Sequence, residues 1–176
     1  ALTLLARIFM RHDLTQSRRK MPTAGIKTGT YRISKTINAP LPFVYEWCTD
    51  FRDDDTQLTG SKSIRHVVEK TEKRVVYVVD YKVNGKDLWH ASVIALNPPN
   101  SWHLETACDK YEDEIGEYNL TKLGKGRTRL DMVFRMRYKN PPYKIDTKKE
   151  WEEDTSRFWD KLIAALDRDY AKSKAS

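Results

Sequence analysis

His90 lies in a segment where several other side chains could take part in chemistry with it. A neutral imidazole can accept a proton from a bound molecule or hydrogen-bond to its carbonyl group. Tyr77, Tyr81 and Ser92 would place their hydroxyl groups on the same face as His90 in a β-hairpin. His90 and Tyr81 are therefore the best catalytic candidates. The plainer interpretation, which we favour, is a core histidine hydrogen-bonded to one of these hydroxyl groups.

The hairpin is predicted by Asn84-Gly85, which separates strand-like runs at 75–83 and 86–96. Asn and Gly both accept the positive φ that a two-residue turn requires. The turn also determines which residues lie opposite each other on the two strands. The expected cross-strand pairs are Tyr81–Leu88, Val79–His90 and Tyr77–Ser92. A slip of one residue would turn His90 outward and bring Trp89 inward.

Further strands are predicted around this hairpin, at 31–37, 64–69, 102–108, 115–122 and 129–138. The last of them alternates most regularly, which indicates one buried and one wet face. Its expected pairs with the preceding strand are Leu120–Leu130, Tyr118–Met132 and Gly116–Phe134. A glycine opposite a phenylalanine predicts a bend in the sheet or space for a large ring.

A long amphipathic helix is predicted from Thr147 to about Lys172. Thr147 and Glu150 have the spacing of a capping box. Its apolar residues are three, four and seven apart: Trp151, Phe158, Trp159, Leu162, Ile163, Leu166 and Tyr170. A shorter helix is predicted at 41–48. This order of elements predicts an α+β helix-grip fold, in which a curved antiparallel sheet of about seven strands wraps around the C-terminal helix and short helices follow the first strand.

Two segments resemble the START-like superfamily, also called SRPBCC. Ile37-Asn38-Ala39-Pro40, followed by Val44-Tyr45 and Asp50, resembles its first-strand exit and first helix. Gly116-Glu117-Tyr118 and Gly124-Lys125-Gly126-Arg127-Thr128 resemble its last hairpin. This superfamily includes pollen-allergen-like carriers, polyketide cyclases and dehydratases, and lipid-transfer domains. The resemblance implies a cavity between the sheet and the final helix for an apolar or aromatic small molecule, but it carries over no catalytic residue.

The candidate ligand-binding site consists of side chains on the concave face of the sheet and on the facing stripe of the helix. They are Tyr77, Val79, Tyr81, Leu88, His90, Ser92, Ile94, Trp102, Leu104, Thr106, Tyr118, Leu120, Met132, Phe134, Met136, Phe158, Trp159, Leu162 and Ile163. Apolar walls with a few hydroxyl groups and one imidazole are typical of a small-molecule pocket. A filled core without a cavity is the alternative that the pattern leaves open.

Three functions follow from this reading. The favoured one is a carrier or sensor that binds a lipid, quinone, isoprenoid or polyketide-like molecule without a cofactor. A polyketide cyclase or dehydratase would fold a reactive chain in the same cavity while His90 or Tyr81 moves protons. A protein-interaction module would use the outer face of the sheet or the basic N-terminal segment.

Metal sites are not predicted. The aspartates at 50, 53, 54 and 55 lack the spacing and the glycine of a calcium loop, so they are expected in a solvated connection. The four histidines show no HxxxH or Cys/His pairing that would indicate zinc. The acidic residues Glu112, Asp113, Glu114 and Glu117 are expected to form a wet edge. Two cysteines, Cys48 and Cys108, predict buried, unbridged thiols and a reducing, cytoplasmic location.

The net charge of +7 comes from the N-terminal segment. Residues 1–36 hold eight basic side chains and one acidic one, which leaves 24 of each in the other 140 residues. A nucleic-acid-binding domain carries its basic patch on the folded surface, so nucleic acid is not expected as a partner. We expect residues 1–28 to be a poorly ordered extension that could touch a membrane or protein transiently, and 29–176 to form one domain. Met21 is an alternative start.

Overall fold

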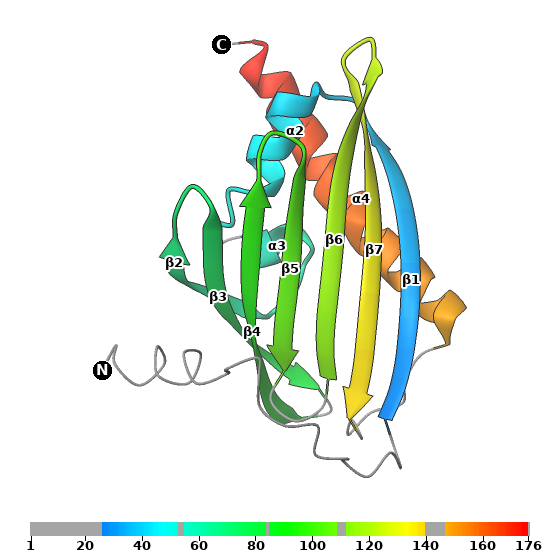
Figure 1. Cartoon of the computed structure of the whole chain (residues 1–176). Helices are drawn as coiled ribbons and strands as arrows, with labels where there is room; N and C mark the ends of the chain where they lie inside the picture. Colours follow the sequence, from blue (N-terminus) through cyan, green and yellow to red (C-terminus); the bar gives the residue numbers. More distant parts are fainter. Residues whose placement is uncertain (1–25, 53–54, 84, 109–111, 140–146, 176) are drawn as a thin grey trace.

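The computed structural model shows a curved antiparallel sheet with helices on its concave side (Figure 1); it describes residues 26–52, 55–83, 85–108, 112–139 and 147–175. The elements are β1 (Ile26–Ile37), α2 (Leu41–Cys48), α3 (Asp55–Leu58), β2 (Ile64–Lys70), β3 (Arg74–Val83), β4 (Lys86–Asn97), β5 (Ser101–Cys108), β6 (Glu112–Gly124), β7 (Arg127–Lys139) and α4 (Lys148–Ser173). The strand order β1-β7-β6-β5-β4-β3-β2 confirms the predicted helix-grip architecture. β1 begins before the predicted domain boundary, and the rest of the predicted extension, residues 1–25, lies outside the described residues.

Both predicted hairpin registers are confirmed. The structure pairs Tyr81 with Leu88, Val79 with His90, Tyr77 with Ser92, Leu120 with Leu130, Tyr118 with Met132, and Gly116 with Phe134. His90 therefore faces the concave side of the sheet, whereas the side chain of Trp89 is 47% exposed on the outer side.

Glycine is required at two places in the β6–β7 hairpin. Gly116 leaves room for a large ring, as predicted, but the ring belongs to Tyr118 rather than to Phe134 across the ladder. A Cβ on Gly116 would lie 2.9 Å from Cε2 of Tyr118, which is closer than such contacts come. In the turn, Gly124 and Gly126 have φ of 75° and 69°, in the left-handed region that glycine adopts without steric cost.

The N-terminal half of α4 is attached to β1. The predicted capping box is confirmed: the backbone N–H of Thr147 donates to Glu150 Oε2 (2.8 Å), and the N–H of Glu150 donates to Thr147 Oγ1 (3.3 Å). One turn further on, the rings of Trp151 and Tyr31 stack at 4.3 Å. Lys35 of β1 then forms an ion pair with Asp160 at 2.6 Å.

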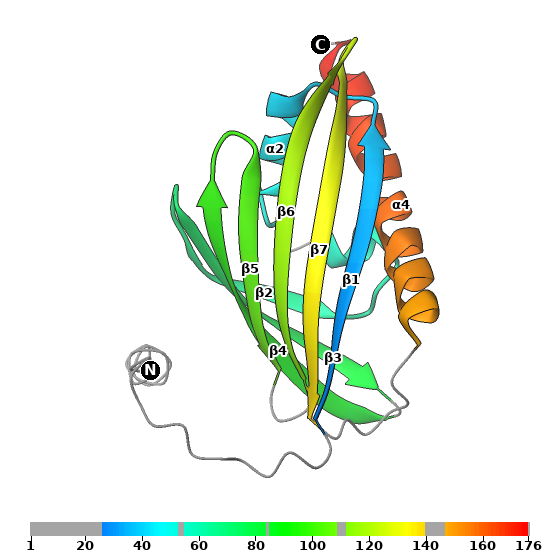
Figure 2. The same cartoon turned by 45° about the vertical axis from the view of Figure 1, so that its right-hand side comes forward.

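The C-terminal half of α4 is attached to α2. Trp47 Nε1 donates to Asp169 Oδ2 at 3.1 Å, and the rings of Phe43 and Tyr170 lie 4.9 Å apart. Figure 2 shows α4 running along the β1 side of the sheet, with α2 close to its C-terminal end. The helix is thus fixed at two places, and Ala165 and Leu166 between them are buried in the core.

Leu166 fixes the apolar stripe of α4 in the core. Its side chain is 1% exposed and joins the cluster around Val44, Ile94 and Leu130. Removing such a side chain loses its transfer free energy and leaves a cavity.

Leu166→Ala is expected to lower the free energy of unfolding by about 2–5 kcal/mol, the range for buried leucines. Urea unfolding followed by circular dichroism measures this difference. Leu123→Ala is the matched control because Leu123 is 40% exposed, and it should change stability little. Equal losses in both variants would contradict the described position of Leu166.

Candidate functional site

A cavity of about 670 Å³ lies between the concave face of the sheet and α4. Most residues of the predicted site line it. These are Tyr77, Val79, Tyr81, His90, Ile94, Trp102, Leu104, Thr106, Tyr118, Phe134, Phe158, Trp159 and Leu162. The filled core without a cavity, left open by the sequence, is therefore not what the structure shows.

Six predicted site residues lie elsewhere. Leu88, Ser92, Leu120, Met132, Met136 and Ile163 are not among the side chains that line the cavity. Five of them are buried, and Ile163 packs against the core. α2 packs against β6 and β7, and α4 packs against β1, so inward side chains there contribute to the packed core. The hydroxyl group of Ser92 is hydrogen-bonded to that of Thr106 at 2.8 Å.

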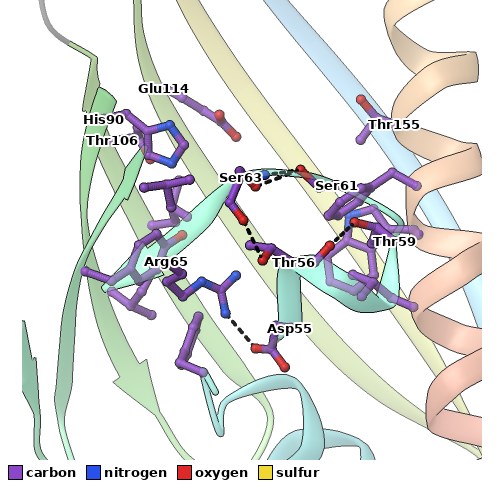
Figure 3. Close-up of a pocket in the computed structure, with 18 of the residues that line it drawn as sticks. Asp55, Thr56, Thr59, Ser61, Ser63, Arg65, His90, Thr106, Glu114 and Thr155 are labelled. Atoms are coloured by element: carbon purple, nitrogen blue, oxygen red, sulfur yellow. Dashed lines mark hydrogen bonds and ion pairs between the residues drawn. The ribbon is translucent and has the colours of Figure 1, made fainter. Parts of the chain in front are cut away.

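Part of the wall was not predicted from the sequence. It comes from the segment between the end of α2 and the start of β2, from Glu114 of β6 and from the start of α4. These residues are Trp47, Cys48, Phe51, Asp55, Thr56, Thr59, Ser61, Ser63, Arg65, Glu114, Trp151, Asp154 and Thr155. Figure 3 shows polar side chains of this segment facing those of β4–β6 across the pocket. Hydrogen bonds hold the segment in place: Thr56 Oγ1 donates to the carbonyl of Ser63 (2.9 Å), and Lys161 of α4 donates to that of Thr59 (3.1 Å).

Arg65 places a cation in this wall. Its Nη1 donates to Asp55 Oδ2 at 2.6 Å and to the carbonyl of Arg52 at 3.2 Å. The guanidinium also lies over the ring of Tyr77, 4.9 Å from its centre. Its Nε is buried and has no hydrogen-bond partner among the described residues. Asp55, expected in a solvated connection, is instead the counter-ion of Arg65.

His90 lies between two tyrosine rings, at 6.5 Å from that of Tyr77 and 5.5 Å from that of Tyr81. Burial, and then the positive charge of Arg65, lower the pKa of His90 from 6.5 to about 4. The imidazole is therefore neutral at physiological pH, when it can both donate and accept a hydrogen bond.

The prediction that Glu114 belongs to a solvent-exposed acidic edge is wrong. β6 begins at Glu112, earlier than expected, and the pleat places Glu114 on the concave face, between Thr106 and Met136 of the neighbouring strands. Its side chain lines the cavity. Asp113 and Glu117 do point outward, where they pair with cations of β7.

The apolar wall is built from rings that contact one another. Trp102 and Tyr118 stack with their centres 4.9 Å apart and their planes at 12°. Tyr118 also lies 6.0 Å from Trp159 of α4, and Phe134 lies 5.0 Å from Trp151. Burial, followed by the charge of Glu114, raises the pKa of Tyr118 well above its usual value. Its hydroxyl group therefore stays protonated.

Cys48 also lines the cavity and is a free thiol. Burial, and then the charges of Asp50 and Asp55, raise its pKa, so the thiolate needed for nucleophilic chemistry does not form at neutral pH. In the described ranges, no three His, Cys, Asp or Glu side chains come together as a metal site. None of the helices that the structure describes has the length and apolarity to cross a membrane.

His90→Gln is expected to weaken the pH dependence of stability. The pKa of His90 is about 4 in the folded protein and 6.5 without the fold, so only the unfolded state takes up this proton as pH falls between these values. At about 1.4 kcal/mol per pKa unit, this costs the wild type up to about 3 kcal/mol. Urea unfolding at a series of pH values measures the effect. Curves for wild type and variant that stay parallel through this window would contradict the shift.

No family model matches the chain, and no curated protein matches its sequence. Many solved structures resemble it, and three of them illustrate the likeness. Zhui aromatase/cyclase from Streptomyces sp. R1128 is 15% identical with a TM-score of 0.62, covering 81% of this chain and 95% of its own. Ara h 8.0201 is 12% identical with a TM-score of 0.62 over 80% and 98%. A START superfamily protein from Mycobacterium smegmatis is 11% identical with a TM-score of 0.60 over 81% and 97%. The chain thus has the same helix-grip fold as these proteins, which is the fold that the resemblance found in the sequence implied.

Proposed function

We propose that this protein binds an apolar or aromatic small molecule in the cavity under α4, as a carrier or sensor. The observation that carries the proposal is the cavity of about 670 Å³, where ten of the described lining side chains are Phe, Trp or Tyr. This volume lies in the range of small-molecule sites. A ligand that buries roughly 300 Å² of apolar surface would gain about 7 kcal/mol before the cost of ordering it. Micromolar affinity corresponds to about 8 kcal/mol, so contacts with the polar groups and rings of the wall would have to supply the remainder and offset that cost.

The polar groups of the cavity would orient such a ligand. Arg65, His90 and Thr106 can donate hydrogen bonds, and Glu114 can accept them. In Figure 3, His90, Thr106 and Glu114 lie on the sheet side of the pocket, and Arg65 lies below His90. A lipid, quinone, isoprenoid or polyketide-like molecule with a polar group on an apolar body fits this combination.

Val79→Trp should block binding of N-phenyl-1-naphthylamine, a neutral aromatic probe whose fluorescence rises in apolar surroundings. Val79 is buried in the wall of the cavity, so an indole there fills space that the probe would occupy. We expect a loss of affinity of about tenfold or more, which is about 1.4 kcal/mol or more. Fluorescence titration measures it.

The matched control for this experiment is Val78→Trp, on the same strand but outside the set that lines the cavity. It should leave probe affinity within about twofold of wild type. No uptake by the wild type would contradict the proposed function. Native mass spectrometry of protein purified from its own cells, under conditions that preserve complexes, would then identify any ligand that occupies the cavity.

A polyketide cyclase or dehydratase is the second candidate. It is supported by the similarity to the aromatase/cyclase fold and by the 5.5 Å separation of the Tyr81 and His90 rings in the cavity wall. A neutral His90 can take a proton from a bound polyketide chain, and Tyr81 can donate one to a developing enolate oxygen.

If the protein is such an enzyme, His90→Ala and Tyr81→Phe should each lower turnover of a polyketide thioester analogue by about 100-fold or more, the typical contribution of general acid–base catalysis. Binding of N-phenyl-1-naphthylamine should largely survive in both. His103→Ala is the control, because His103 pairs with Glu105 away from the cavity. Turnover that is unaltered in both test variants would rule out these catalytic roles.

A further inference from the structure

The charge of the cavity is the starting point for a narrower inference, which rests on the proposed function. The described lining residues include four charged side chains, of which Arg65 is a cation and Asp55, Glu114 and Asp154 are carboxylates. With all four ionised, their sum is negative. His90 does not offset it, because its imidazole is neutral at physiological pH. Among the described lining side chains, carboxylates therefore outnumber cations.

Arg65 contributes little positive charge to a ligand. Asp55 is its direct partner at 2.6 Å, and the two side chains are only 16% and 17% exposed. The carbonyl of Arg52 accepts a second hydrogen bond from the same nitrogen. A ligand carboxylate would have to compete with a carboxylate that the chain already holds close to Arg65.

Glu114 and Asp154 differ in position. The side chain of Asp154 is 59% exposed on α4. Glu114 projects from the concave face of β6, at the same level as Thr106 on β5. Figure 3 shows its carboxylate and the ring of His90 on the same side of the pocket. Glu114 is thus the carboxylate that an enclosed ligand would meet.

The aromatic walls also favour a positively charged ligand. The face of an aromatic ring carries partial negative charge and attracts cations within about 6 Å of its centre. The chain already uses this attraction, because the guanidinium of Arg65 lies 4.9 Å from the centre of Tyr77 and 6.0 Å from that of Phe51. Trp102, Tyr118 and Trp159 offer further rings in the same cavity.

We propose that the cavity selects an aromatic ligand that carries a protonated amine, with Glu114 as the counter-ion of the ammonium group and the ring wall as the site of the aromatic body. The ammonium group loses water on entry, and the short contact with Glu114 in a low-dielectric site offsets that loss. A ligand with a carboxylate in the same place loses water and is repelled.

Three ligands with the same naphthalene body test the charge preference: 2-(1-naphthyl)ethylamine, 2-(1-naphthyl)ethanol and 1-naphthylacetic acid. Isothermal titration calorimetry at neutral pH and low salt gives their affinities. The amine is expected to bind about tenfold or more tightly than the acid, with the alcohol between them. Glu114→Gln should lower amine affinity about tenfold and leave that of the alcohol within about twofold.

Glu117→Gln is the matched control on the same strand, since Glu117 points outward and pairs with Arg135 at 2.7 Å. It should leave all three affinities unchanged. Asp55→Asn removes the charge that offsets Arg65, so it should raise the affinity of the acid. Circular dichroism and urea unfolding check that each variant is folded, and the amine-to-acid ratio of the wild type tests the proposal without any variant.

The possible results distinguish failure of the charge selection from failure of the proposed function. Equal binding of the three ligands would leave the proposed function standing and overturn the charge selection. Tightest binding of the acid would overturn it too and identify Arg65 as the recognition group. Binding of none of them would contradict both the selection and the proposed aromatic ligand.

Discussion

The attachment of α4 to β1 and to α2 fixes the position of this helix over the sheet, and the cavity and the core both depend on that position. The contacts of Trp151 and Asp160 with β1, and of Asp169 and Tyr170 with α2, hold the helix across the mouth of a curved sheet. The α4 side chains that line the cavity lie between Trp151 and Leu162, in the first part of the helix. Further on, Ala165 and Leu166 are buried in the core. The contacts with β1 therefore hold the cavity-lining part of α4 over the curved sheet, and the contacts with α2 hold the part that completes the core.

In a largely apolar cavity, the few charged side chains of the wall interact strongly. Arg65 and Asp55 lie at 2.6 Å with little exposure to water, where charges interact more strongly than on the surface. Burying such a pair costs desolvation free energy, and leaving one member alone costs more. The pair also connects β2 to the first residue of α3, so a charged contact closes the side of the cavity that α4 does not reach. The Arg65–Asp55 pair therefore both closes the cavity wall and supplies charged groups to it.

Sequence analysis recovered what depends on local rules. The Asn84-Gly85 turn determined the β3–β4 register, and the two-residue period of β7 identified its buried face. It failed where placement depends on tertiary contacts. Arg65 follows an exposed Ile64, so polarity alone would turn that strand the wrong way. Glu114 looked like surface because its strand begins earlier than the apolar pattern does. Side chains on the concave face either pack in the core or line the cavity, and which of the two each one does depends on the positions of α2 and α4.

The aromatic rings of the cavity wall support one another. Trp102, Tyr118 and Phe134 contact one another along the sheet, edge to face or stacked, which fixes each ring before any ligand arrives. A preformed wall lowers the ordering cost of binding, but it attracts almost any apolar body. In the proposed role, discrimination between such bodies would depend on the polar side chains of the wall, which in its described part include His90, Glu114 and the Arg65–Asp55 pair. The fold would provide the volume, and the polar side chains would provide the selectivity.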